Sequence, residues 1–164
     1  MGIKTLGIDI TKRAFQLHSV NAKGKVVLKK RLSREALLSF IVNLLSCTIG
    51  MESCSGSNYW ARKFRSYGHE VKLMSSQYVK PYVKTNKTDA NDAEAVCEAM
   101  THPSIRFVSV KSAEQQDIQS LHRYRQRIVE QRTALANQIR SLLTEYRIVI
   151  SPRNWVLRKN YRNV

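Results

Sequence analysis

The sequence predicts a mixed α/β fold whose sheet begins as an antiparallel meander and continues with strands that alternate with helices. Three strand-like segments follow one another at the start of the chain, at residues 4–10, 14–20 and 25–29. The turn sequence Asn21-Ala22-Lys23-Gly24 separates the last two, as a hairpin requires. Further strand-like segments at 48–52 and 70–74 each follow a helical pattern, so the sheet is not a purely doubly wound one.

Helical patterns account for most of the chain between and after these strands. Ser33 is the predicted N-cap of a helix over 34–46, and Ser57 is the predicted N-cap of the helix that follows the fourth strand. A loop rich in Ser, Lys and Tyr is predicted over 75–88, and a further helix over 89–101.

A long helical pattern then runs from about residue 112 to residue 145 without an internal Gly or Pro. Its apolar stripe consists of residues spaced by threes, fours and sevens: Ile118, Leu121, Ile128, Leu135, Ile139 and Leu142. At a rise of 1.5 Å per residue this helix would be roughly 50 Å long. Because that length exceeds one face of a small domain, we expect the helix to project and to pair with another helix as a coiled coil.

Charge and composition restrict the classes of partner. The 164 residues include 28 Lys and Arg against 12 Asp and Glu, which gives a formal net charge of +16. Such a charge favours polyanionic partners and leaves nucleic acid, anionic membranes and acidic proteins open. No apolar run approaches the roughly 20 residues of a membrane span, and the first residues lack the zones of a signal peptide. The scattered Cys and His residues argue against zinc. Because a membrane span and a signal peptide are both missing from the pattern, we expect a soluble cytoplasmic protein without a membrane partner.

Four carboxylates are the strongest candidates for chemistry. Asp9 lies within one apolar strand, and Glu52 ends another. Asp89 and Asp92 lie three apart at the start of a helix. Acids gathered in one place repel one another, and a hard cation such as Mg²⁺, which prefers oxygen ligands, relieves that repulsion. Two such ions can clamp the attacking and leaving oxygens of a phosphodiester.

Each of these acids also has an ordinary structural interpretation. Asp9 and Glu52 could be strand-end acids paired with nearby hydroxyls or lysines. Asp89 and Asp92 could cap their helix, because the helix dipole favours acids there, and their spacing alone favours this role. The presence of four such acids at the ends of successive elements favours a shared metal site.

Two groups of basic residues are candidates for binding nucleic acid. The loop before the 89–101 helix interleaves lysines with aromatic rings, which suits phosphates and stacked bases: Lys80, Tyr82, Lys84 and Lys87. The long helix carries arginines that suit a structured RNA or DNA backbone: Arg123, Arg125, Arg127, Arg132 and Arg140. The alternative is a solvated, mobile loop and a helix whose charges only keep it soluble.

Several long motifs resemble a known family. GIDITKRAF, GMESCSGSNYWARKF, KTNKTDANDAEAVCEA and RTALANQIRSLLTEY closely resemble the N-terminal half of the DEDD transposases, the Piv-like insertion-sequence recombinases, over residues 3–146. The resemblance implies a RuvC-like, ribonuclease H-like domain that binds one or two Mg²⁺ ions. It also implies that the four metal-binding acids of the family stand at Asp9, Glu52, Asp89 and Asp92. A structured guide RNA that pairs with DNA, and assembly of copies through the long helix, follow from the same resemblance.

The chain departs from the family pattern toward its end. Family members continue into a second domain that carries a serine thought to attack the DNA strand, and they often have glycine where Arg147 stands here. We therefore predict a RuvC-like DEDD catalytic domain over 1–111 and a helical coiled-coil arm over 112–150. Residues 151–164 are predicted to be an unpatterned tail at a truncation of the second domain.

The sequence thus predicts the N-terminal domain of a DNA transposase that cleaves and exchanges DNA strands with metal, guided by RNA and incomplete in this chain. Two alternatives stay open. The first is a stand-alone junction-resolving nuclease that uses metal-activated water. The second is a non-catalytic DNA- or RNA-binding regulator of the full-length transposase.

Overall fold

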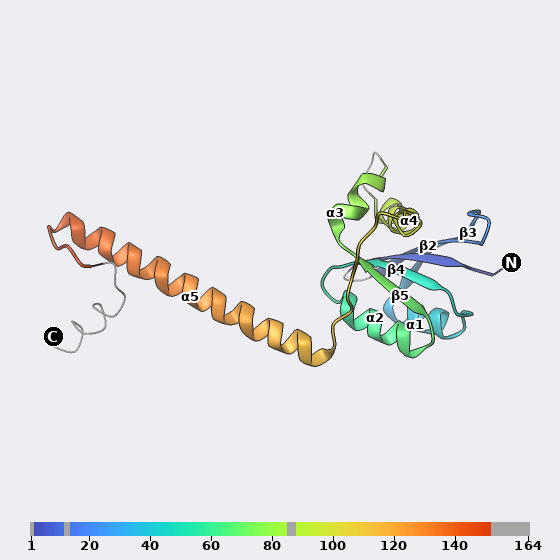
Figure 1. Ribbon diagram of the computed structural model, residues 1–164, viewed down its shortest axis with the longest axis horizontal. Coiled ribbons are helices and arrows are strands. Elements are labelled where there is room, and N and C mark those ends of the chain that lie inside the picture. Colours follow the sequence, from blue (N-terminus) through green and yellow to red (C-terminus); the bar gives the residue numbers. More distant parts are fainter. Residues whose placement is uncertain (1, 12–13, 85–87, 152–164) are drawn as a thin grey trace. The chain divides into compact units, whose positions relative to one another are not determined.

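The computed structural model describes residues 2–11, 14–84 and 88–151 (Figure 1). The chain forms two compact units, Met1–Ser112 and Ala113–Val164. None of the helices within the described residues is both long and apolar enough to cross a membrane.

The first unit contains one mixed sheet of six strands in the order β3-β2-β1-β4-β5-β6. The strands are β1 Thr5–Ile10, β2 Ala14–Val20, β3 Val26–Ser33, β4 Thr48–Glu52, β5 Glu70–Met74 and β6 Phe107–Val108. The first three strands pair antiparallel, β4 runs parallel to β1, β5 runs parallel to β4, and β6 is antiparallel to β5. The predicted mixed α/β sheet with an opening meander is confirmed.

The third strand is longer than the predicted segment 25–29. β3 pairs with β2 along its whole length, from Val26 opposite Val20 to Ser33 opposite Ala14. Its second half is polar and basic, which hid its strand character from the apolar pattern. A strand at the edge of a sheet tolerates such residues because its pairing depends on backbone hydrogen bonds.

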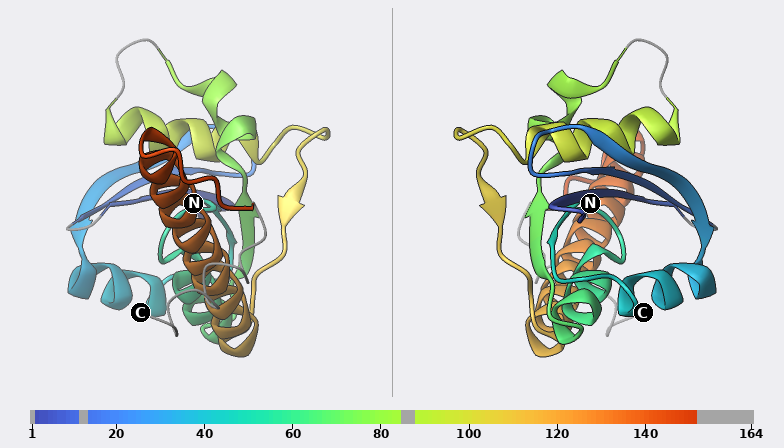
Figure 2. Two further views of the ribbon diagram at one scale, coloured as in Figure 1. Left: turned by 90° about the vertical axis from the view of Figure 1, so that its left-hand side faces the viewer. Right: turned by 90° about the vertical axis from the view of Figure 1, so that its right-hand side faces the viewer.

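Helices cover both faces of the sheet, as Figures 1 and 2 show. They are α1 Arg34–Val42, α2 Ser57–Ser66, α3 Ser76–Val79, the 3₁₀ turn η1 Lys80–Tyr82, and α4 Asp89–Ala99. α1 and α2 lie on one face, and α3 and α4 on the other. Alternate residues of the central strands, such as Leu6, Ile8, Ile49 and Met51, form the main core on the α1 and α2 face.

The helix caps agree with the sequence in one case and differ in another. The Ser33 hydroxyl accepts a hydrogen bond from the Ala36 amide, as a predicted N-cap does, although α1 ends at Val42 and not at residue 46. The prediction that Ser57 caps α2 is wrong. The N-cap is Gly56 at φ 86°, and the Ser57 hydroxyl donates to the Cys54 carbonyl oxygen at 2.8 Å. A side chain on Gly56 would be strained in this left-handed conformation.

The segment predicted as a loop over 75–88 contains α3 and η1. Both elements are too short to carry the 3.6-residue periodicity by which helices are predicted from sequence. Val79 of α3 is buried in a second apolar cluster with Val96 of α4, so α3 packs against α4.

The second unit is dominated by α5, a single continuous helix over Ala113–Glu145 of 33 residues. Ala136 is the only buried residue among the described residues of α5. Most of the predicted apolar stripe is exposed, namely Ile118, Leu121, Ile128, Leu135 and Leu142. The long helix agrees with the sequence, whereas its pairing as a coiled coil stays a prediction.

Candidate metal centre and nucleic-acid surfaces

Asp9 and Glu52 lie on the same face and at the same edge of the sheet. β1 and β4 are parallel neighbours with Thr5 opposite Thr48 and Gly7 opposite Gly50. Side chains two residues apart along a strand point to the same face of the sheet. Asp9 therefore lies on the same face as Gly7, and Glu52 lies on that face with Gly50. The two carboxylates therefore end adjacent strands side by side, as a shared site requires.

Two glycines let α4 lie close to this same face. A Cβ atom on Gly7 would lie 2.4 Å from the carbonyl oxygen of Ala93 and 2.7 Å from the amide nitrogen of Cys97. A Cβ atom on Gly50 would lie 2.1 Å from the sulfur of Met100. A side chain on Gly7 would therefore clash with the backbone of α4, whereas one on Gly50 would meet only the flexible end of Met100. Both glycines interrupt otherwise apolar strands, a signal in the sequence from which this close approach could have been predicted.

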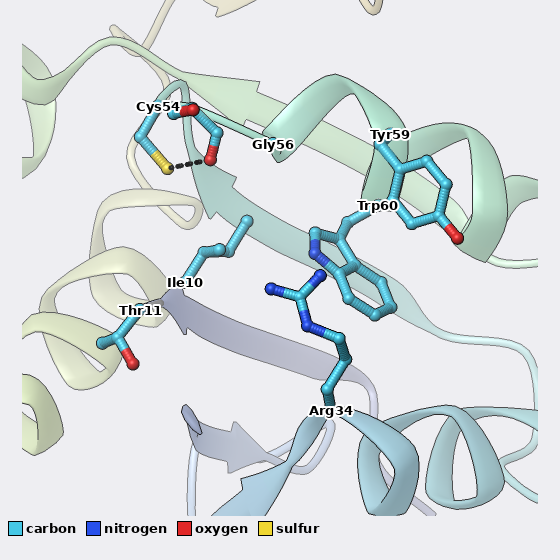
Figure 3. A pocket seen from close by; sticks show the side chains of 8 residues that line it. Ile10, Thr11, Arg34, Cys54, Gly56, Tyr59 and Trp60 are labelled. Carbon is cyan, nitrogen blue, oxygen red and sulfur yellow. Dashed lines mark hydrogen bonds between the residues drawn. The ribbon is translucent and has the colours of Figure 1, made fainter. Parts of the chain in front are cut away.

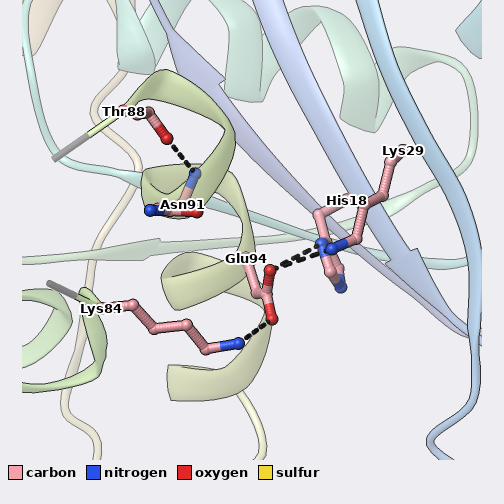
Figure 4. Close-up of polar contacts among 6 residues, drawn as sticks. All are labelled: His18, Lys29, Lys84, Thr88, Asn91 and Glu94. Carbon is pink, nitrogen blue, oxygen red and sulfur yellow. Dashed lines mark hydrogen bonds and ion pairs between the residues drawn. The ribbon is translucent and has the colours of Figure 1, made fainter. Parts of the chain in front are cut away.

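The packing of α4 brings its first turn to the Asp9 edge. The Thr88 hydroxyl accepts a hydrogen bond from the Asn91 amide at 3.2 Å, so Thr88 is the N-cap (Figure 4). Asp89 and Asp92 occupy the first turn, where acids interact favourably with the helix dipole. Asp89 is exposed, whereas Asp92 is half-buried.

The electrostatics of Asp9 report how near the other three acids lie. The pKa of Asp9 is raised from its ordinary 3.8 to about 6, first by burial and then by the negative charges of Asp92, Asp89 and Glu52. Each of the other predicted acids therefore acts on Asp9 through space. Within residues 2–11, 14–84 and 88–151, however, no three His, Cys, Asp or Glu side chains are close enough together to hold a metal ion.

The donor set itself fits a hard divalent cation. It consists of carboxylate oxygens, the ligands that Mg²⁺ prefers, and the repulsion that raises the pKa of Asp9 is the kind that a cation removes. Asp9, Glu52, Asp89 and Asp92 are the residues that could hold it. The exposed Asp89 and the half-buried Asp92 would have to turn toward Asp9 to share an ion.

The candidate nucleic-acid-binding residues near α4 differ in how exposed they are and in whether they already contact other residues. Lys80 is exposed on η1. The Tyr82 ring lies 4.7 Å from the ring of His102 and is half-buried, so part of its surface already packs within the protein. Lys84 is exposed but forms an ion pair with Glu94 at 2.5 Å. Lys87 lies outside the described residues.

The ion pair of Lys84 belongs to a cluster around Glu94 that the sequence did not predict (Figure 4). Glu94 also contacts Lys29 at 3.1 Å and the Nδ1 atom of His18 at 3.8 Å. The hydrogen bond from Lys84, followed by Lys29 and outweighing the effect of burial, lowers the pKa of Glu94 to about 2. Burial lowers the pKa of His18, which favours its neutral form. The cluster joins α4, β2, β3 and the segment after η1.

The arginines of α5 form the second candidate surface. Arg123, Arg125, Arg127 and Arg132 are exposed. Arg140 is half-buried and donates a hydrogen bond to the Asn137 side-chain oxygen at 2.8 Å. The exposed arginines are free to meet solvent or a polyanion.

A mixed α/β sheet with acids at one edge and a large positive net charge is the kind of domain that acts on nucleic acid. Comparison with known proteins identifies the family of the chain. The profile of the IS110-type DEDD family, described as "Transposase", matches residues 6–148. The chain belongs to this family of DEDD transposases.

Individual relatives agree with this assignment. The chain is 47% identical over 153 residues to a probable family 20 transposase of Pseudomonas aeruginosa, covering 93% of this chain and 45% of that protein. It is 46% identical over 149 residues to the transposase for insertion sequence element IS1111A of Coxiella burnetii, covering 91% and 41%. The chain therefore spans less than half the length of these relatives.

Among solved structures, the chain is similar to T. thermophilus RuvC in complex with a Holliday junction substrate. The TM-score is 0.45 at 10% sequence identity, over 63% of this chain and 98% of that chain. A similarity of this size carries no conclusion about function.

Proposed function

We propose that this chain is the metal-dependent, RuvC-like catalytic domain of an RNA-guided DNA transposase. Membership of the DEDD transposase family supports the class of function. The single observation that carries the site is the pairing of β1 with β4, which sets Asp9 beside Glu52; there burial first, and then the charges of Asp92, Asp89 and Glu52, raise the pKa of Asp9. Repulsion among carboxylates at one edge of a sheet is the electrostatic signature of a cation site.

In this proposal, the four acids hold one or two Mg²⁺ ions. When bound, Mg²⁺ supplies charge stabilisation at the scissile phosphate of the DNA strand. Asp9 and Glu52 are fixed by the sheet and set the position of the site. Asp89 and Asp92 close it from the first turn of α4. The attacking serine comes from the second domain that the family resemblance implies.

The basic residues bind the backbones of DNA and of the guide RNA. The first group is Lys80, Tyr82, Lys84 and Lys87, which precede α4 in the sequence, and the second is the set of arginines on α5. The exposed apolar stripe of α5 pairs two copies of the chain. The proposed substrate is chromosomal DNA, which in bacteria lies in the cytoplasm, so we place the protein there.

Titration of Mg²⁺ into the protein, followed by calorimetry, tests the metal site. We expect Asp9→Asn and Glu52→Gln to abolish the binding heat that the unaltered chain gives. The matched control is Asp117→Asn, which neutralises an exposed acid of α5 and should leave the binding heat unchanged. Equal binding heats for Asp9→Asn and Asp117→Asn would refute the proposed site.

Incubation of the chain with branched DNA and Mg²⁺ separates the proposal from its two rivals. The proposal predicts metal-dependent binding of the DNA without cutting, because the attacking serine that the family resemblance implies belongs to a second domain. Cutting that Asp9→Asn abolishes would instead identify a self-sufficient nuclease. Binding that is unchanged when all four acids are neutralised, with or without Mg²⁺, would identify a non-catalytic regulator.

A further inference from the structure

A pocket of about 550 Å³ opens at the edge of the sheet where Asp9 and Glu52 lie (Figure 3). Its walls come from the last residue of β1 and the residue after it, from the loop after β4, and from the first turns of α1 and α2. The volume falls within the roughly 300–1,000 Å³ of small-molecule sites in proteins. None of its residues was a candidate in the sequence analysis.

The pocket has a cationic wall built on aromatic rings. The Arg34 guanidinium lies 5.4 Å from the ring centre of Trp60 and 5.8 Å from that of Phe15, both of which are buried. These cation–π contacts hold an exposed guanidinium in place. Among the described residues, no carboxylate lies within ion-pair distance of Arg34. An oriented arginine without an acidic partner suits a phosphate.

A second wall offers a stacking surface. Tyr59 is 51% exposed and packs edge-on against Trp60 with ring centres 5.3 Å apart. Its ring is thus held by one edge while about half of its surface faces solvent at the pocket. An exposed aromatic ring beside a cation is the combination that binds one unpaired nucleotide, by stacking of the base and by charge at the phosphate.

The loop between these walls brings backbone close to any ligand. Gly56 adopts φ 86° and is the N-cap of α2, a helix of 10 residues whose N-terminal end lines the pocket. The amide of Ser57 is taken by the Cys54 carbonyl oxygen at 3.2 Å. The dipole of α2 adds to the positive potential that Arg34 supplies.

The pocket and the four acids lie at the same edge of the sheet. Ile10 and Thr11 of the pocket directly follow Asp9, and Cys54 lies two residues after Glu52. The pocket lies on the α1 and α2 face and the acids lie on the α4 face, so the two meet at the end of β1 and β4. Burial, and then the negative charges of Glu52 and Asp9, raise the pKa of the pocket's Cys54, so the charges of both acids reach the pocket. A DNA strand whose phosphate lies at the acids would carry its neighbouring nucleotide to Arg34 and Tyr59.

We infer that this pocket binds an unpaired nucleotide of the substrate DNA strand, next to the phosphate that the four acids hold. The inference rests on the proposed function and adds two binding residues to it. Tyr59 stacks on the base, and Arg34 binds the phosphate. The Trp60 ring lies between these two groups and contacts both (Figure 3).

Binding of a single-stranded DNA of roughly 12 nucleotides, followed by fluorescence anisotropy without divalent metal, tests the pocket. We expect Tyr59→Ala and Arg34→Gln each to weaken binding about tenfold, the loss of one stacked base or one oriented phosphate contact. The matched controls are Tyr67→Ala, at the other end of the same helix, and Arg106→Gln, an exposed arginine outside the pocket. Both controls should change binding less than about twofold. Circular dichroism confirms that all four variants are folded.

Photocrosslinking locates the contact independently of affinity. A DNA strand that carries 5-iodouracil should crosslink to the peptide that contains Tyr59. Crosslinks confined to other peptides, or pocket variants that bind as the controls do, would overturn the inference. A loss of binding seen only with RNA of the same sequence would show that the pocket does not serve the DNA strand. Because no divalent metal is present, failure of the four acids to bind Mg²⁺ does not affect these results.

Discussion

Individual side chains at the acid edge carry charges that oppose one another, and Asp9 shows the effect clearly. Its carboxylate lies at the end of a central strand, partly removed from water and beside three other acids. Both influences favour the neutral form. At neutral pH the folded protein therefore holds Asp9 ionised at a cost in stability, and a cation bound there would offset that cost.

The pH dependence of this cost can be measured. The pKa of Asp9 is about 6 in the folded chain and near the ordinary 3.8 in the unfolded chain, so stability falls as pH rises from about 4 to about 6. Without divalent metal, we expect Asp9→Asn to raise the melting temperature at about pH 7.5 and to leave it nearly unchanged below about pH 4. Thermal unfolding by circular dichroism gives the comparison.

Glu70 provides a control, because its pKa is shifted in the opposite direction to that of Asp9. A hydrogen bond from the Thr48 hydroxyl lowers the pKa of Glu70, so its contribution to stability is present at neutral pH and is lost as pH falls. Glu70→Gln should therefore lower the melting temperature slightly at neutral pH. A fall in melting temperature for Asp9→Asn as well would show that the Asp9 carboxylate is not under repulsion.

Glu94 behaves in the opposite way to Asp9 because its neighbours are lysines. Its pKa of about 2 lies below the ordinary 4.5, so its ion pairs stabilise the folded chain at neutral pH and are lost as pH falls from about 4.5 to about 2. We expect Glu94→Gln to cost about 0.5–1 kcal/mol at neutral pH, since both lysines are largely exposed. Urea unfolding measures this, with the exposed Glu98→Gln on the same helix as the control. Equal costs for the two variants would contradict a role for the cluster.

At the level of secondary-structure elements, the contact between α4 and the sheet decides whether the acids can act together. Gly7 lies against the backbone of α4, whereas Gly50 lies against the flexible end of Met100. Backbone cannot move without shifting the whole helix, while a methionine side chain changes rotamer easily. The two glycines therefore differ in how far they tolerate a methyl group.

This difference gives a matched pair of variants. We expect Gly7→Ala to destabilise the chain by about 1–3 kcal/mol and to weaken Mg²⁺ binding, because α4 is pushed away from Asp9. Gly50→Ala should cost less and leave Mg²⁺ binding nearly unchanged. Urea unfolding and calorimetry measure the two effects. Stronger loss of metal binding in Gly50→Ala than in Gly7→Ala would contradict the role of α4.

The C-terminus of α5 shows a second effect at this scale. Ile148 donates its amide to the Leu143 carbonyl at 3.0 Å and Arg147 to that of Thr144 at 2.9 Å, which is a Schellman motif. Arg147 therefore has φ 59°, a conformation that glycine adopts more easily. Glycine at this position is what the family resemblance implies.

Replacement of Arg147 by glycine should therefore stabilise the end of α5 by about 1 kcal/mol. Far-ultraviolet circular dichroism during heating measures helix loss. The control, Ser141→Gly, places glycine in the helix interior and should lower stability by about 1 kcal/mol. A lower melting temperature for Arg147→Gly would mean that the motif does not form in solution.

For the whole molecule, net charge and the exposed stripe of α5 determine which partners are favourable. The formal charge of +16 supplies attraction to nucleic acid that weakens as salt is added. Leu121, Ile128, Leu135 and Leu142 repeat every seven residues and are each at least 45% exposed. Apolar side chains with this spacing are typical of a helix that pairs with another helix.

Self-association through this stripe is therefore expected. Ile128→Asp should reduce the measured mass toward that of a monomer in analytical ultracentrifugation, because a charge would be buried in the pair. Gln126→Asp adds the same charge to an exposed polar position of α5 and is the control. A monomer for the unaltered chain, or equal masses for both variants, would rule out pairing through the stripe.

Local patterns in the sequence determined the order of the elements, the mixed sheet and the long helix. Alternating and 3.6-residue periodicities depend on neighbours along the chain, so segments such as 48–52 and 70–74 were predicted with their observed bounds. Three features were not predicted: the polar half of β3, the short helix α3 and the glycine N-cap of α2. Pairing at a sheet edge, a four-residue helix and a glycine in a left-handed conformation leave little periodic signal in the sequence.

Tertiary structure alone decided which side chains meet. The register of β1 and β4 put Asp9 and Glu52 on one face, and the glycines beneath α4 brought Asp89 and Asp92 within electrostatic reach. The pairing of Glu94 with a lysine 65 residues away, and the placing of Arg34 over Trp60, are likewise contacts between distant parts of the chain. Sequence patterns fix local conformation because they act over a few residues, whereas the distances that decide charge and binding arise only when the elements pack.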